Sequence, residues 1–197
     1  MTRQFGAGEL SPQYDKALKF ASDAHRKQMR KSGEVPYLSH LLRVSGLVLD
    51  YGASEEVAIA ALLHDVVEDC GGMEAYEEIR REFGEKVASI VLETSDSTSS
   101  DPDKKLPWRE RKENYINRLA DESEAAALIA ACDKLDNVTS LTRALLISND
   151  RTILTKFKGG KEGSMWYWNS IIRILRQRKI VAAEELANAV ARLEEIW

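Results

Sequence analysis

Four of the six residues from His64 to Asp69 are ionisable, and they directly follow an apolar stretch. The ionisable side chains are one histidine and three acids: His64, Asp65, Glu68 and Asp69. The preceding residues, Ala58 to Leu63, are all apolar. Burying unpaired charge beside such a stretch is costly. Because a bound metal ion would offset that cost, we expect metal chemistry at this run.

Two more residues extend the candidate site to a full ligand set. The expected metal ligands are His40, His64, Asp65 and Asp133. Two histidines and two carboxylates from three helices suit Mn²⁺, Fe²⁺ or Zn²⁺ better than calcium, provided that open positions remain for water. Each residue also has a simpler interpretation: a lone histidine such as His40 is often structural, and Asp133 could pair with its neighbour Lys134.

Helical spacing predicts how these side chains are arranged. Residues three or four apart share a face of a helix. His64 is therefore expected to lie over Glu68, and Asp133 shares a face with Asp136 and Asn137. Acids at a helix C-terminus oppose the helix dipole. The position of Glu68 therefore favours a functional role over that of a solvated helix end.

The elements that position these residues all have helical periodicity, and no convincing strand pattern is present. Ser11 and Pro12 are typical of an N-cap followed by a first-turn proline. The expected helices cover about residues 12–24, 41–52, 54–69, 76–83, 86–93, 107–119, 123–146, 166–177 and 181–196. We therefore expect an all-α, single-domain protein of about eight to ten helices.

Turn-forming residues predict the connections between these helices. Gly33 and Pro36 indicate a loop at 31–37, and Gly71-Gly72 is expected to close the third helix. Residues 95–103 include no apolar side chain and are interpreted as a connector in preference to a substrate lid. Residues 158–163 are expected to form a second, glycine-rich loop. His25 lies in a basic stretch and is expected on a positively charged surface, outside the ligand set.

The bulk properties restrict the class of protein. The chain has 197 residues, a net charge of −4 and two cysteines, Cys70 and Cys132. Two cysteines make no disulfide framework, and the first ten residues lack the apolar core of a secretion signal, so we expect a cytoplasmic protein. No segment is apolar enough to span a membrane. The negative charge argues against broad binding to nucleic acid but leaves a small anion open.

Read together, these residues resemble a known family. The pattern His40, His64-Asp65 and Asp133 resembles the HD superfamily of metal-dependent phosphohydrolases. Longer segments resemble its alarmone hydrolase branch, which includes the hydrolase domain of the RelA/SpoT enzymes and stand-alone small hydrolases. These segments are 25–28 with Arg30 and Lys31, 36–40, 61–69, 83–84 and 133–137. The similarity spans about residues 11–180, the expected core of a single HD-type helical domain at 1–197, and nothing resembles the synthetase domain.

The resemblance implies an activity and a role for each matching residue. The activity is Mn²⁺-dependent hydrolysis of the 3′-pyrophosphate of ppGpp or pppGpp, which releases pyrophosphate and GDP or GTP. The implied roles are metal ligation by His40, His64, Asp65 and Asp133, catalysis by Glu68, Asp69 and Asn137, and substrate binding by Arg30, Lys31 and Asn137. Arg26 or Arg43 could clamp further phosphates, since guanidinium groups bind them bidentately.

Two departures from the family pattern leave the substrate open. Asp136 stands where the family commonly has a tyrosine, and its carboxylate would repel phosphates unless it is paired or turned away. Met165 stands near another expected tyrosine, which puts the identity of the purine in doubt. The adenosine analogue ppApp is a close variant. The alternatives are an HD phosphohydrolase for a nucleoside monophosphate, a dNTP or a cyclic dinucleotide, and a non-catalytic nucleotide-binding domain. The oligomeric state is not predicted.

Overall fold

The computed structural model describes residues 9–31, 34–98, 101, 103, 105–148 and 151–197. Within these residues the chain forms nine α-helices, and its extended pairing is an isolated antiparallel bridge between Met29 and Pro36. The prediction of an all-α protein is confirmed. Gly33 and part of the predicted 95–103 connector lie outside the described residues. No described helix is both long and apolar enough to cross a membrane.

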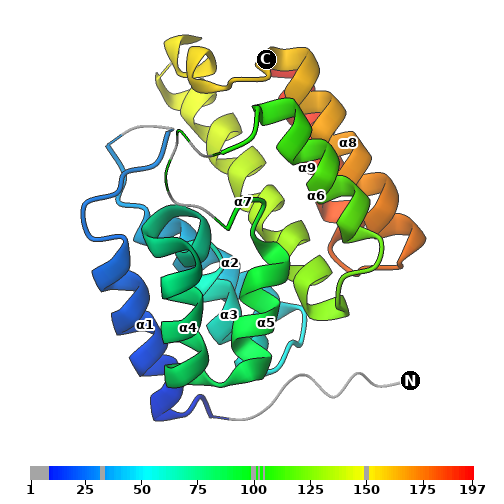
Figure 1. Ribbon diagram of the computed structural model, residues 1–197. Helices are drawn as coiled ribbons and strands as arrows, with labels where there is room; N and C mark the ends of the chain where they lie inside the picture. The colour runs from blue at the N-terminus through cyan, green and yellow to red at the C-terminus, as the bar shows by residue number, and fades with distance from the viewer. Residues whose placement is uncertain (1–8, 32–33, 99–100, 102, 104, 149–150) are drawn as a thin grey trace.

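Figure 1 shows the helices in chain order. Their bounds are α1 Pro12–Ala24, α2 Leu38–Asp50, α3 Glu55–Leu63, α4 Gly72–Phe83, α5 Glu85–Thr94, α6 Trp108–Leu119, α7 Glu124–Ser148, α8 Gly160–Gln177 and α9 Ala183–Ile196. A π-helical turn, η1 (Val67–Gly71), lies between α3 and α4, and a 3₁₀ helix, η3 (Arg151–Lys156), lies between α7 and α8.

Two groups of helices share the long helix α7. Helix α3 packs against α1, α2 and α5, while α8 packs against α6 and α9 (Figure 1). Helix α7 contacts members of both groups. Every residue of α3 from Val57 to Leu63 is buried, as expected of a helix that is apolar on all sides. Both α3 and α7 therefore run through the core, where a polar side chain needs a partner.

Local sequence explains several of the helix ends. The Oγ of Ser11 accepts a hydrogen bond of 3.2 Å from the N–H of Gln13, which caps α1 as predicted. Gly84 separates α4 from α5 with a φ of 89°, a left-handed conformation that favours glycine. These two predicted boundaries are confirmed.

The predicted third helix is wrong beyond Leu63. Helix α3 ends there, and the chain passes through η1 before α4 begins at Gly72, so Gly71-Gly72 opens a helix instead of closing one. The Nδ1 of His64 forms a hydrogen bond of 2.8 Å with the carbonyl oxygen of Ala61. That ring competes with the N–H that a continuing helix would pair with the same carbonyl. The ladder is interrupted, and a wider π turn follows, as often occurs at functional sites.

The predicted glycine-rich loop at 158–163 is wrong beyond Gly159, because α8 begins at Gly160. Its glycines make room for an aromatic ring. A Cβ on Gly159 would lie 2.5 Å from the Cη2 of Trp108, and one on Gly163 would lie 3.3 Å from it. The absence of side chains at Gly159 and Gly163 thus lets α6 pack closely on α8.

Candidate active site

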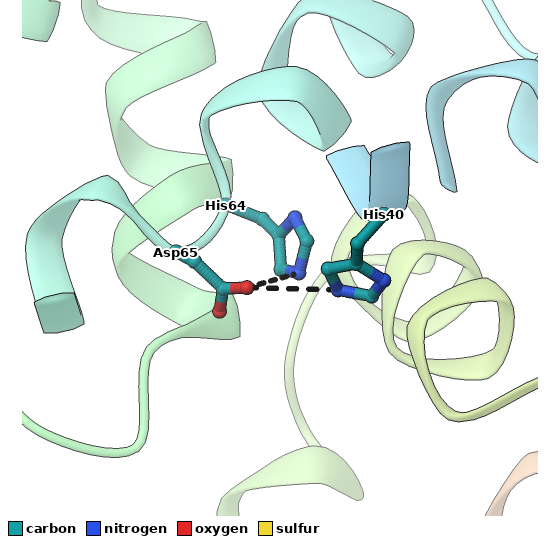
Figure 2. A group of neighbouring side chains, drawn as sticks. All are labelled: His40, His64 and Asp65. Carbon is teal, nitrogen blue, oxygen red and sulfur yellow. Dashed lines mark ion pairs between the residues drawn. The ribbon is translucent and has the colours of Figure 1, made fainter. Parts of the chain in front are cut away.

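Three of the expected metal ligands converge at the end of α3. His40 comes from the first turn of α2, and His64 and Asp65 directly follow α3 (Figure 2). One ligand atom from each of these residues lies within 4.8 Å of the others. Both histidines are buried. The break after Leu63 allows the adjacent side chains of His64 and Asp65 to face the same point.

Asp133, in the middle of α7, lies at the same point. Its Oδ1 is 3.3 Å from the Nε2 of His40 and 3.9 Å from the Nε2 of His64. Its other oxygen pairs with Lys134. Asp133 therefore makes the neighbouring ion pair that the sequence left as an alternative and also faces the two histidines. The structure brings all four expected ligands together.

The buried histidine nitrogens indicate that a cation fits here. The Nε2 atoms of His40 and His64 are buried and lack a hydrogen-bond partner within the described part of the chain. Buried polar atoms normally have one. The other nitrogen of each ring is already held, since His64 Nδ1 lies 2.8 Å from the carbonyl of Ala61 and His40 Nδ1 lies 2.6 Å from Asp136 Oδ2. Each Nε2 is thus left for a metal.

The charges of the cluster favour a cation as well. Burial opposes a charged His40, but the carboxylates of Asp133, Asp136 and Asp65 around its ring outweigh that effect and raise the pKa of His40 to about 10. Burial also opposes a charged Asp65, yet His64 and His40 hold the pKa of that carboxyl well below its ordinary value. A divalent cation would take the place of the bound proton in this negative field.

The expected catalytic acids, Glu68 and Asp69, lie on η1 among basic side chains. Lys105 Nζ donates to the carbonyl of Glu68 at 3.0 Å and lies 3.6 Å from its Oε1. The same Nζ is 3.9 Å from Asp69 Oδ1. Arg111 Nη1 is 3.4 Å from Glu68 Oε1. The acid pair therefore faces two cations, Lys105 and Arg111, which follow residues 95–103 in the chain.

A buried carboxylate, Asp96, holds one of these cations, Arg111. Asp96 pairs with Arg111 and, at 2.5 Å, with Lys112. Burial and the charge of Asp96 raise the pKa of Glu68 to about 7, against the opposing charge of Lys112. Burial and the charge of Asp65 also raise the pKa of Asp69. A carboxylate with a pKa near neutrality is suited to proton transfer.

Of the two expected substrate-binding cations, Arg30 reaches the site. Arg30 is buried, and its Nη2 donates to Asn137 Oδ1 at 3.1 Å. Asn137 in turn donates to Asp133 Oδ1 at 2.5 Å. Lys31 is exposed, and its backbone carbonyl accepts a hydrogen bond from Lys156. Asn137 thus links Arg30 to the cluster, whereas Lys31 stays at the surface.

The expectation that His25 lies on the surface is wrong, because His25 is 3% exposed. Its ring stacks on Tyr37 at 5.1 Å between centroids, and its Nδ1 lies 2.7 Å from Gln28 Oε1. The hydroxyl of Tyr37 donates to Asp65 Oδ2. The neighbouring basic residues point to a surface, but packing against Tyr37 buries this one ring.

The sequence interpretation missed several residues of the site. Tyr37, Lys105 and Arg111 contact the expected ligands or acids, and Asp96 pairs with Arg111. Tyr37 precedes His40 by three positions, and this helical spacing could have indicated it. The other three lie far along the chain, where no periodicity relates them to Glu68. Arg26 pairs with Asp23 at the surface, and Met165 is buried in the core.

A family model for the HD domain matches residues 17–152, which include all four expected ligands and the acid pair. The chain belongs to the HD domain family. Its HD domain is similar to a fruit-fly (Drosophila melanogaster) protein named guanosine-3′,5′-bis(diphosphate) 3′-pyrophosphohydrolase MESH1. The two are 38% identical over 134 residues, which cover 66% of this chain and 70% of the fly protein.

Two further comparisons agree with this assignment. A guanosine-3′,5′-bis(diphosphate) 3′-pyrophosphohydrolase of Aquifex aeolicus is 37% identical over 129 residues, 64% of this chain and 17% of that protein. A solved structure described as a metazoan ortholog of SpoT that hydrolyses ppGpp superposes with a TM-score of 0.77 at 30% identity. The superposition covers 97% of this chain and 100% of that one. The HD fold is thus shared over nearly the whole chain.

Proposed function

We propose that this HD domain hydrolyses the 3′-pyrophosphate of (p)ppGpp, yielding GDP or GTP and pyrophosphate. The observation that carries the proposal is the position of a buried His/Asp cluster beside an acid pair flanked by Lys105 and Arg111. This arrangement provides for a cation, a base and a polyanion at one place. The names of the similar fly and bacterial proteins support the same reaction.

We propose Mn²⁺ as the cofactor, with Fe²⁺ or Zn²⁺ as the alternatives. The residues that would hold it are His40, His64, Asp65 and Asp133. A mixed set of imidazole and carboxylate donors suits these ions. When bound, such an ion lowers the pKa of water and neutralises phosphoryl oxygens.

The acid pair supplies the proton transfer in this proposal. Water attacks the phosphorus bonded to the ribose 3′ oxygen, the bond between that phosphorus and the 3′ oxygen breaks, and Glu68 passes the proton that it takes from the water to the leaving 3′ oxygen. Glu68 orients the water and accepts its proton, because its raised pKa makes it a better base than an ordinary carboxylate. Asp69 Oδ2 accepts a hydrogen bond of 2.8 Å from Gln28 Nε2, and Asp69 assists Glu68 in the proton transfer.

The basic side chains bind the phosphates. Lys105 and Arg111 lie against Glu68, where negative charge develops on the reacting phosphate. Arg30 and Asn137 approach from the side of Asp133. Lys31, at the surface, would contact the outer part of the nucleotide.

The product profile tests the proposal. The protein is incubated with Mn²⁺ and, separately, ppGpp, ppApp, a nucleoside monophosphate and a dNTP, and the products are resolved by ion exchange. We expect pyrophosphate from ppGpp. Release of orthophosphate or triphosphate, or release of pyrophosphate from ppApp alone, would show that ppGpp is not the substrate. Metal binding without turnover of any nucleotide would support the non-catalytic alternative.

The remaining expectations are also proposals. We propose that the domain takes in residues 1–197, with its core at about 11–180, and that the protein acts in the cytoplasm on a small nucleotide without binding nucleic acid. Cys70 and Cys132 are both free, which is consistent with a reducing compartment.

A further inference from the structure

Asp136, which departs from the family pattern, lies at the centre of a buried network. Its side chain is 3% exposed. One oxygen lies 2.6 Å from His40 Nδ1 and 2.8 Å from Arg30 Nη1. The other accepts from Arg43 Nε, and Arg43 also donates to Ser140 at 3.2 Å. The carboxylate is therefore fully paired, so it does not repel phosphates as an unpaired one would.

The two ligand histidines are held by different kinds of acceptor. The Nδ1–H of His64 donates to the neutral carbonyl of Ala61. The Nδ1–H of His40 donates to the charged Asp136. A carboxylate behind an imidazole fixes its tautomer and makes the other nitrogen a stronger ligand, and losing it commonly weakens metal binding about 10–100-fold.

Asp136 also orients the proposed phosphate-binding side of the site. The Arg30 guanidinium spans from Asp136 to Asn137, and Asn137 continues to Asp133. Asp136 therefore touches one expected metal ligand directly and reaches a second through Arg30 and Asn137. Arg43 holds this arrangement from its half-buried outer side.

We propose that Asp136 is a positioning residue of the metal centre, which aims His40 Nε2 at the cation and holds Arg30 beside Asn137. This inference rests on the proposed metal site. It assigns to the aspartate of this chain, and to its partner Arg43, a task that the sequence left unexplained.

The test compares wild type with Asp136→Asn, which keeps the volume of the side chain and removes its charge. Calorimetry with Mn²⁺ alone is expected to show about 10–100-fold weaker binding in the variant. The matched control is Asp96→Asn, which alters another buried, paired carboxylate that lies away from the histidines, and it is expected to bind Mn²⁺ like wild type. Arg43→Gln is a second variant in case Asp136→Asn fails to fold, and it is expected to weaken binding less.

Nuclear magnetic resonance of the Zn²⁺-loaded protein gives a second readout. The Nδ1–H signal of His40 is expected to move upfield in Asp136→Asn, while that of His64 stays in place because its acceptor is Ala61. Equal Mn²⁺ affinity in wild type and both variants, or equal movement of both histidine signals, would overturn the inference and leave the proposed function standing. Failure of wild type itself to bind Mn²⁺ would overturn both.

Discussion

The His/Asp cluster and the acid pair are neighbours, but they differ in what surrounds their carboxylates. At the cluster, Asp65 and Asp133 face two histidines whose Nε2 atoms have no hydrogen-bond partner among the described residues. At the acid pair, Glu68 faces Lys105 and Arg111. The first arrangement attracts a cation, whereas the second has cations of its own and can attract an anion.

The two regions also differ in how they are held. The cluster is anchored on α2, α7 and the end of α3. Asp136 holds the Nδ1 of His40, and the carbonyl of Ala61 holds the Nδ1 of His64. The acid pair lies on the turn η1, and its cations come from the segment before α6 and from α6 itself. Metal binding and proton transfer should therefore be separable by substitution, which gives four ways to test the comparison.

The largest effect is expected from Glu68→Gln. Removing the proposed base should lower kcat for pyrophosphate release about 10²–10⁴-fold, the usual contribution of general acid–base catalysis. Mn²⁺ affinity, measured by calorimetry, should stay at the wild-type value because Glu68 lies outside the ligand cluster. Full activity of this variant would remove Glu68 from the mechanism, and loss of metal binding would show that the two regions are one.

Asp133→Ala, unlike Glu68→Gln, should weaken metal binding. Removal of a ligand should weaken Mn²⁺ binding by about 100-fold or more, at or above the upper end of effects seen for outer-sphere partners. Because the change also frees Lys134, Asp133→Asn is the companion variant that keeps the volume. If calorimetry finds unchanged affinity in folded Asp133→Asn, Asp133 does not belong to the ligand set.

Lys105→Met tests the anion-facing side of the comparison. Loss of one charge-assisted hydrogen bond, worth about 1.5–3 kcal/mol, should raise KM for ppGpp about 10-fold or more. Lys86→Met is the control, since Lys86 is exposed and pairs with the exposed Glu56 at 2.8 Å. Steady-state kinetics showing equal KM values for both variants would count against a phosphate contact at Lys105.

The smallest effect is a shift in pH dependence on Asp96→Asn. The charge of Asp96 helps to raise the pKa of Glu68, so its removal should lower that pKa. The basic form of Glu68 then appears at lower pH, and the acidic limb of kcat/KM should move to lower pH. A limb that stays in place, or moves up, would mean that another group controls it.

Much of the fold could be predicted from local pattern. Capping at Ser11, the break at Gly84 and the apolar periodicity of the helices depend on neighbours in the chain, and these predictions are confirmed. The predictions that failed depend on distant contacts. Gly159 and Gly163 suggest a loop until the Trp108 ring is placed against them, and His25 suggests a surface until Tyr37 covers it.

By itself, the sequence determined which residues could hold a metal, because His40, His64, Asp65 and Asp133 have distinctive types and spacings. Only the tertiary structure decided the charge around them. Asp136 meets Arg43 and His40 more than ninety positions earlier in the chain, and Arg111 meets Glu68 across 43 positions. Helical periodicity acts over a few residues, whereas these pairs form because packed helices bring distant side chains within hydrogen-bond distance.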